Sequence, residues 1–161
     1  MTRSLQESVH RQVEILGEHL RRAGWQLGVA ESLTGGQLAA GISEGPRASE
    51  WFRGGVVAYQ PATKRKLLGV SDGPVVSERC AVEMARGVAT LLDAEVGVAL
   101  TGVGGPGPAE GQAPGTVWMA VHTPNGDVSQ LAQLEEHDPS EVCTISCALA
   151  IRLANEALGI P

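Results

Sequence analysis

The apolar residues of this chain fall into two patterns. Over residues 3–22 they recur at every third or fourth position, which is the period of one face of a helix. The residues concerned are Leu5, Val9, Val13, Leu16 and Leu20. Elsewhere they form short runs, at 26–30, 51–59 and 95–102, with the length of buried strands. The pattern predicts a helix at the start of the chain and strands after it.

Turn and capping residues place helices between these strands. The small-residue stretch 37–43 follows a glycine-rich turn, and Pro61 suits the first position of a helix that runs to Leu68. Ser77 can cap a further helix. One side of that helix is apolar, with Ala81, Met84, Ala85, Val88, Leu91 and Leu92. Strands that alternate with helices are typical of an α/β fold.

The later part of the chain adds a long loop and a hairpin. Residues 101–115 are the richest in glycine and proline, and a loop of this length inside a domain is usually functional or mobile. The apolar run 116–123 then precedes Asn125 and Gly126, a strong hairpin signal, with 127–136 as the partner strand. The sequence therefore predicts two antiparallel strands at one side of the sheet.

The chain closes with a well-marked helix. Asp138 supplies a cap, Pro139 the first helical position and Glu141 the acid of a capping box, for a helix over 139–158 that stops at Gly159. With the preceding elements, this predicts a three-layer α/β/α sandwich around a mixed, mostly parallel sheet.

Length and composition narrow the class of protein. The 161 residues suit a single domain, 1–161. A composition with 43% hydrophobic and 19% charged residues is typical of a soluble protein that does not bind membranes. The first residues lack the apolar core of a secretory signal, and three cysteines form no CxxC pair, so we expect a cytoplasmic protein. A net charge of −6 and only five aromatic residues argue against a nucleic-acid partner.

Three polar motifs follow predicted strands, at 31–36, 59–64 and 101–107. Because ligands of α/β sheets bind beyond the carboxyl ends of the strands, we expect the motifs to meet in one crevice. The glycines permit close approach of the backbone. Free N–H groups at the helix start after Thr34 could hold a phosphate or an oxyanion.

Ser32, in the first motif, is a candidate nucleophile that needs a base. The histidines are interpreted as surface or capping residues: His10, His19, His122 and His137. Lys64 is the remaining base, and its pKa can fall because it lies in the first turn of a helix beside Arg65 and Lys66, with burial as a further cause. Tyr59, the one tyrosine, could relay a proton between them.

Each candidate also has a purely structural interpretation. Ser32 or Thr34 can be a helix cap, Tyr59 a core aromatic, Lys64 a solvated lysine and 101–107 a flexible loop. The cysteines lack further ligands for a metal site. The residues alone leave both interpretations open.

At these motifs the chain resembles the CinA C-terminal-domain family, whose stand-alone members act as nicotinamide-mononucleotide amidohydrolases. The matching segments are AESLTGG at 30–36, the stretch from Trp51 to Lys64, TGVGGPG at 101–107 and GTVW at 115–118. The resemblance covers nearly the whole chain from about residue 5, and its four motifs occur in the order of the family pattern. The resemblance implies deamidation of nicotinamide mononucleotide to the nicotinate nucleotide and ammonia.

The resemblance also implies residue roles: Ser32 as nucleophile, Lys64 as base and Tyr59 as relay. The implied substrate-binding residues are Thr34, Gly35, Gly36, Thr101, Gly102, Gly104, Gly105 and Gly107. It implies no metal, no cofactor and a homodimer. An alternative is a binding or regulatory module without activity.

The chain departs from the family pattern at two places. The residues between Tyr59 and Lys64 are QPAT, where members commonly have a sequence such as SNEA, but the spacing is kept. Pro139 and Cys143 stand where arginines are expected. If those arginines hold the substrate phosphate, Arg47, Arg53 or Arg152 would have to replace them.

Overall fold

A computed structural model describes residues 3–160 and, within its helices and strands, the side chains from residue 7 onward. The elements in chain order are α1 (Arg3–Ala23), β1 (Leu27–Glu31), α2 (Gln37–Ser43), a short 3-10 turn η1 (Ala48–Glu50), β2 (Phe52–Val57), α3 (Pro61–Leu68), α4 (Glu78–Leu91), β3 (Val96–Gly102), β4 (Thr116–Thr123), β5 (Gly126–Gln133) and α5 (Pro139–Ala157). Every predicted helix and strand is present, with ends that differ by a few residues.

The five strands form one sheet in the order β2-β1-β3-β4-β5. β1 pairs in parallel with β2 and β3, whereas β3 with β4 and β4 with β5 are antiparallel. The predicted mixed sheet is confirmed, but "mostly parallel" is too strong for its pairings. Four of the five strands nevertheless run in the same direction, since the hairpin returns β5 to it.

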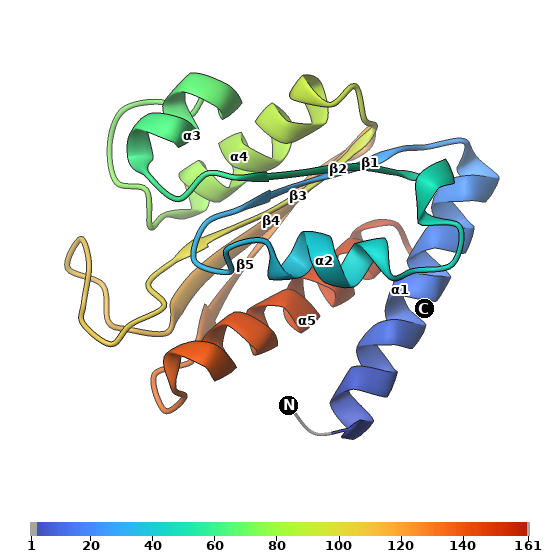
Figure 1. The fold of residues 1–161 in the computed structure, drawn as a ribbon. Coiled ribbons are helices and arrows are strands. Elements are labelled where there is room, and N and C mark those ends of the chain that lie inside the picture. The colour runs from blue at the N-terminus through green and yellow to red at the C-terminus, as the bar shows by residue number, and fades with distance from the viewer. Residues whose placement is uncertain (1–2, 161) are drawn as a thin grey trace.

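Helices cover both faces of the sheet, which confirms the three-layer arrangement. In Figure 1, α3 and α4 lie on one face and α1, α2 and α5 on the other. Each face has its own apolar core, one built around Trp51 and Leu100 and the other around Met84 and Ala99. Because both faces are covered, all five residues of β1 are buried.

The described residues of the helix faces follow the sequence pattern except at Leu91. Val13, Leu16 and Leu20 of α1 are buried, while the side chain of Leu5 lies outside those described. On α4, Leu91 is exposed, because the helix ends at this residue and its apolar face continues to Leu92 instead.

The predicted caps are formed. The Ser77 side chain accepts a hydrogen bond from the Cys80 N–H at the start of α4. Asp138 and Glu141 form a complete capping box at the start of α5. No helix among the described residues is long and apolar enough to cross a membrane.

The strand order places a switch point beside β1. The chain leaves β1 through α2 toward β2 on one side, and then crosses over the opposite face through α3 and α4 to β3 on the other side. Connections that diverge from adjacent strands leave a crevice at their carboxyl ends. The residues that follow β1 and β3 therefore face each other there.

Candidate active site

Ser32 directly follows β1 and begins the turn that leads into α2. β1 is the central strand of the parallel part of the sheet, so its end is held by neighbours on both sides. Only 7% of the Ser32 surface is exposed. The hydroxyl is thus presented from a rigid position beside the crevice.

The turn after Ser32 is built around the carboxylate of Glu31, which is fully buried. Its Oε2 accepts hydrogen bonds from the Thr34 hydroxyl at 2.5 Å, the Gly36 N–H at 3.1 Å and the Leu38 N–H at 3.0 Å. Its Oε1 accepts one from the Ala39 N–H at 2.8 Å. An anion at a helix N-terminus is favoured by the free N–H groups and by the helix dipole. Glu31 therefore fixes the turn that carries Ser32.

The polar groups of Thr34, Gly35 and Gly36, which are predicted to bind substrate, form hydrogen bonds within this turn. The Gly36 N–H is bonded to Glu31, and the Gly35 N–H donates to the Ser32 carbonyl at 3.1 Å. Thr34 is buried and its hydroxyl donates to Glu31. None of the three residues lines the cavity beside Ser32. The helix start binds an anion, as the sequence suggested, but that anion is the protein's own carboxylate.

Lys64 lies in α3, and its amine is buried against three oxygen atoms. The side chain is 1% exposed. Nζ donates to Ser32 Oγ at 2.8 Å, to the Ala58 carbonyl at 2.7 Å and to the Tyr59 carbonyl at 3.3 Å. Pro61 at the start of α3 sets the course of the helix after β2 and so brings Lys64 back over the strand end. The structure thus brings together two residues that are 32 positions apart in the chain.

The three oxygens differ in what they can do. A carbonyl can only accept a hydrogen bond, whereas a hydroxyl can accept or donate. An ammonium at Lys64 can donate to all three oxygens. A neutral amine has two N–H groups for the two carbonyls, which leaves its lone pair for the Ser32 hydroxyl. The geometry therefore directs the basic electron pair of Lys64 at the Ser32 proton.

Burial lowers the pKa of Lys64, while the nearby Cys80 and Glu110 side chains act in the opposite direction. The sequence pointed mainly to the helix dipole and to Arg65 and Lys66. In the structure Arg65 is paired with Asp72, and burial of the amine is the main cause.

Tyr59 approaches Lys64 through its backbone. Its carbonyl accepts the 3.3 Å hydrogen bond, whereas its side chain is 65% exposed. Within residues 3–160 its hydroxyl makes no hydrogen bond to Ser32 or Lys64. The direct 2.8 Å contact between Ser32 and Lys64 leaves no gap that a relaying hydroxyl would bridge. Tyr59 is one of the residues that line the cavity beside the pair.

The cavity has a volume of about 450 Å³ and lies between the turn after β1, α3, the loop after β3 and the start of α5. All five residues predicted from the glycine-rich loop line it: Thr101, Gly102, Gly104, Gly105 and Gly107. The Thr101 hydroxyl itself is held by the Val75 carbonyl at 2.7 Å. These five residues therefore contribute mainly backbone surface to the cavity.

Two acidic residues near the site were missed by the sequence reasoning. Glu31 had a local signal, since an acid just before a helix start is suited to bind its N–H groups. Glu110 had none, because it lies in an irregular loop and reaches the cavity only through the fold. Its Oε2 accepts hydrogen bonds from the Val75 and Val76 N–H groups at 2.9 and 2.8 Å.

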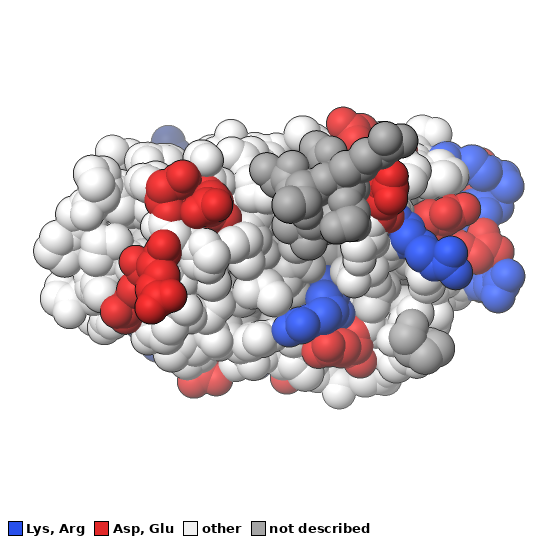
Figure 2. Space-filling model, turned by 90° about the horizontal axis from the view of Figure 1, so that it is seen from below, with Lys and Arg blue, Asp and Glu red and all other residues white. Residues whose placement is uncertain are grey.

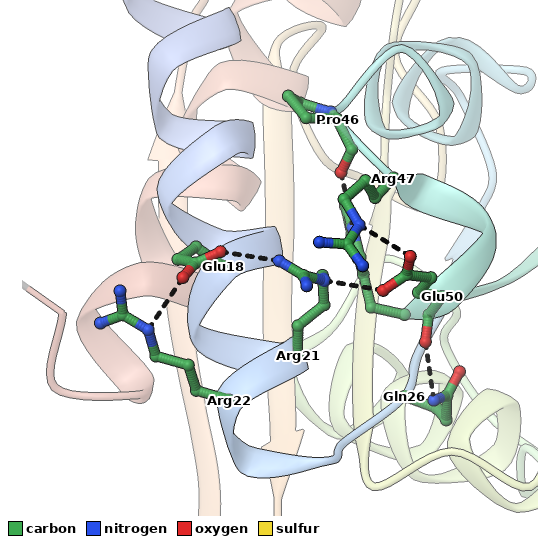
Figure 3. A network of polar contacts seen from close by, with 8 residues as sticks. Glu18, Arg21, Arg22, Gln26, Pro46, Arg47 and Glu50 are labelled. Carbon is green, nitrogen blue, oxygen red and sulfur yellow. Dashed lines mark hydrogen bonds and ion pairs between the residues drawn. The ribbon is translucent and has the colours of Figure 1, made fainter.

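The arginines considered as phosphate ligands lie elsewhere. Arg47 belongs to a network with Arg21, Glu18 and Glu50 near the amino ends of the strands (Figure 3). Arg152 is close to Glu156, and Arg53 lies near the start of β2. None of these arginines lines the cavity.

Fold and site together define a three-layer α/β protein with a buried serine and lysine pair at the switch point of its sheet. Residues 9–158 match the model of the CinA C-terminal domain. The chain belongs to this family.

Curated relatives and solved structures support the membership of this chain in the family. The chain is 39% identical over 153 residues to a CinA-like protein of Frankia casuarinae, and 41% identical over 123 residues to one of Synechocystis. These matches cover 91% and 73% of this chain but only 35% and 30% of those proteins, so the chain spans about a third of their length.

A CinA superfamily protein from Klebsiella pneumoniae has a similar structure, with a TM-score of 0.88 and 30% identity over 94% of this chain and 98% of that one. A superfamily member from Escherichia coli gives a TM-score of 0.87 at 29% identity, over 94% of this chain and 90% of that one.

Removal of the Glu31 carboxylate should destabilise the fold. Glu31→Ala leaves four buried or partly buried donors without an acceptor, and we expect it to lower the free energy of unfolding by about 3 kcal/mol or more. Urea titration measures this. Glu44→Ala, at an exposed position after α2, is the control and should change stability by no more than about 0.5 kcal/mol. Equal stability of the two variants would contradict the role given to Glu31.

The exposed phenol of Tyr59 allows a test of the relay. We expect Tyr59→Phe to keep kcat within about threefold of the parent, because the carbonyl that holds Lys64 is unchanged. Tyr59→Ala, which also removes the ring from the cavity wall, should mainly raise KM. Steady-state kinetics on an amide substrate separate the two. A loss of a hundredfold or more in kcat for Tyr59→Phe would show that the Tyr59 hydroxyl does relay a proton.

Proposed function

We propose that this domain is an amidohydrolase that removes ammonia from the carboxamide of a pyridine nucleotide by a Ser/Lys mechanism. The observation that carries the proposal is the 2.8 Å hydrogen bond between Ser32 Oγ and the buried Lys64 amine, at the wall of a cavity. Nicotinamide mononucleotide is the substrate that the family resemblance implies, with the nicotinate nucleotide as product.

In the first half of the reaction, Ser32 Oγ attacks the carboxamide carbon while neutral Lys64 accepts the hydroxyl proton. The carbonyl oxygen becomes an oxyanion. We assign its stabilisation to the N–H of Leu33, which follows the nucleophile, lines the cavity and has no acceptor for this N–H among the described residues. Lys64 then donates its proton to the amide nitrogen, the C–N bond breaks, and ammonia leaves.

In the second half, the acyl group is an ester on Ser32. Water attacks its carbonyl carbon while Lys64 again accepts a proton. The bond to Ser32 Oγ breaks, Lys64 returns its proton to that oxygen, and the carboxylic acid product loses its own proton to solvent and leaves as the carboxylate. Lys64 thus serves as base and acid in alternation, which requires a pKa nearer to neutrality than that of a solvated lysine.

Ammonia release from nicotinamide mononucleotide, together with a panel of other small amides, tests the proposal. We expect Ser32→Ala to lower kcat by at least about a thousandfold, because the variant keeps the cavity but has no nucleophile. Ser49→Ala, at an exposed position in η1, is the matched control and should retain full activity. Unchanged activity in Ser32→Ala would refute the mechanism. Saturable nucleotide binding without turnover of any amide would instead indicate a binding or regulatory module.

The dependence of rate on pH tests Lys64. Since burial lowers its pKa, Lys64 becomes neutral at a lower pH than a solvated lysine. We expect kcat/KM to rise with pH through this pKa and to level off below about pH 10.4, the ordinary lysine value. Lys66→Ala, which removes an exposed lysine of the same helix, should leave the profile unchanged. A rate that rises only above pH 10.4 would contradict the assignment of Lys64 as base.

A further inference from the structure

Within the described part of the chain, two charged residues line the cavity, Lys64 and Glu110. Lys64 is buried, and its three hydrogen bonds all go to oxygens of the protein. Glu110 is exposed at the cavity wall, where the Val75 and Val76 N–H groups fix its Oε2. Its Oε1 has no hydrogen-bond partner among the described residues. The charge that the cavity offers to a ligand is therefore a carboxylate held in place.

The wall formed by α5 adds no positive charge. Pro139 and Cys143 line it at the positions where family arginines are expected. The Cys143 thiol donates to the Leu33 carbonyl at 3.2 Å, and burial raises its pKa, so it is a neutral group. This wall can contact a ring or a sugar, but it has no cation to pair with a phosphate.

The N-terminus of α5 is also closed to a phosphate. The N–H groups of Ser140 and Glu141, which have no partner within the helix, both donate to Asp138 Oδ1 at 2.9 Å. The capping box thus places a carboxylate where a helix could bind an anion.

The surroundings of the cavity are acidic as well. The segment that leads into α5 exposes Glu135, Glu136, Asp138 and Glu141, while its one imidazole, at His137, faces Glu141 at 3.5 Å. Figure 2 shows red side chains toward the left of the view, the side on which α5 begins, and intermingled blue and red side chains at the opposite end. With a net charge of −6 for the chain, the field at this end opposes the approach of an anion.

We propose that the site prefers a substrate that carries no phosphate. The substrate class is a carboxamide on a neutral or cationic ring, nucleosides included. The Glu110 carboxylate sets the preference for such a substrate over a phosphorylated one. The inference rests on the proposed amide hydrolysis and specifies its substrate. An N-alkylated pyridine ring carries a positive charge that Glu110 attracts, whereas a phosphate would meet the same carboxylate with like charge.

The test compares nicotinamide mononucleotide with nicotinamide riboside, which differ only in the phosphate. We expect kcat/KM for the riboside to be equal to or higher than that for the mononucleotide. A site with a phosphate-binding arginine would favour the mononucleotide by roughly tenfold to a hundredfold. A tenfold preference for the mononucleotide, with Ser32-dependent turnover, would overturn this inference and leave the proposed function intact.

Glu110→Gln tests the residue. Glutamine keeps one oxygen for the Val75 and Val76 N–H groups but loses the charge. We expect kcat/KM to fall about two- to fivefold for the cationic riboside and to stay unchanged for uncharged nicotinamide, and the ratio of the mononucleotide value to the riboside value to rise. Glu44→Gln removes the same charge from an exposed position after α2 and should change none of these values. Equal effects on all three substrates would assign Glu110 a structural role only.

If no amide is turned over, titration calorimetry on the intact chain gives the same comparison from dissociation constants. Tighter binding of the riboside, or equal binding of both, would support the inference although the proposed hydrolysis fails. Tighter binding of the mononucleotide, or binding of neither compound, would overturn it.

Discussion

The burial of one lysine amine is the constraint on which the site depends. A buried ammonium is costly unless hydrogen-bonded, and Lys64 is buried with three oxygen acceptors and no carboxylate in direct contact. Two of the acceptors are carbonyls that can never donate. The third is the Ser32 hydroxyl, so it is the one partner that can give a proton to the amine. The same burial that lowers the pKa of Lys64 also fixes which atom it can deprotonate.

The contact between Ser32 and Lys64 requires both side chains to be held in place, and different interactions hold each of them. Ser32 is fixed by the Glu31 carboxylate, which gathers the N–H groups of the turn and the start of α2. Lys64 is fixed by the helix that Pro61 opens directly after β2. Because β1 and β2 are paired neighbours in the sheet, their carboxyl ends bring Ser32 and the start of α3 close together. The strand order thus determines that the serine and the lysine meet.

The serine and lysine pair and the charged groups at the cavity wall are carried by different parts of the fold. The Ser32 and Lys64 geometry depends on β1, β2, α2 and α3, whereas the outer wall is formed by the loop after β3 and the start of α5. Pro139, Cys143 and Glu110 belong to this second set. Substitutions there change the charge that a substrate meets without moving the amine or the hydroxyl.

The sequence by itself determined the elements, because their signals are local. The helical spacing in α1, the Ser77 cap, the Asn125-Gly126 turn and the Asp138 capping box each depend on residues a few positions apart, and each is present. It also singled out Ser32 and Lys64 as candidates.

Only the tertiary structure decided how those candidates are used. Glu31 carries a local signal as an acid before a helix start, but no local pattern indicates that Tyr59 offers its carbonyl rather than its phenol to Lys64, or that Glu110 lines the cavity. Each of these depends on which groups are left free after neighbouring elements have formed their hydrogen bonds. Pairing between distant segments satisfies some groups and leaves others exposed, and that outcome is a property of the packed fold.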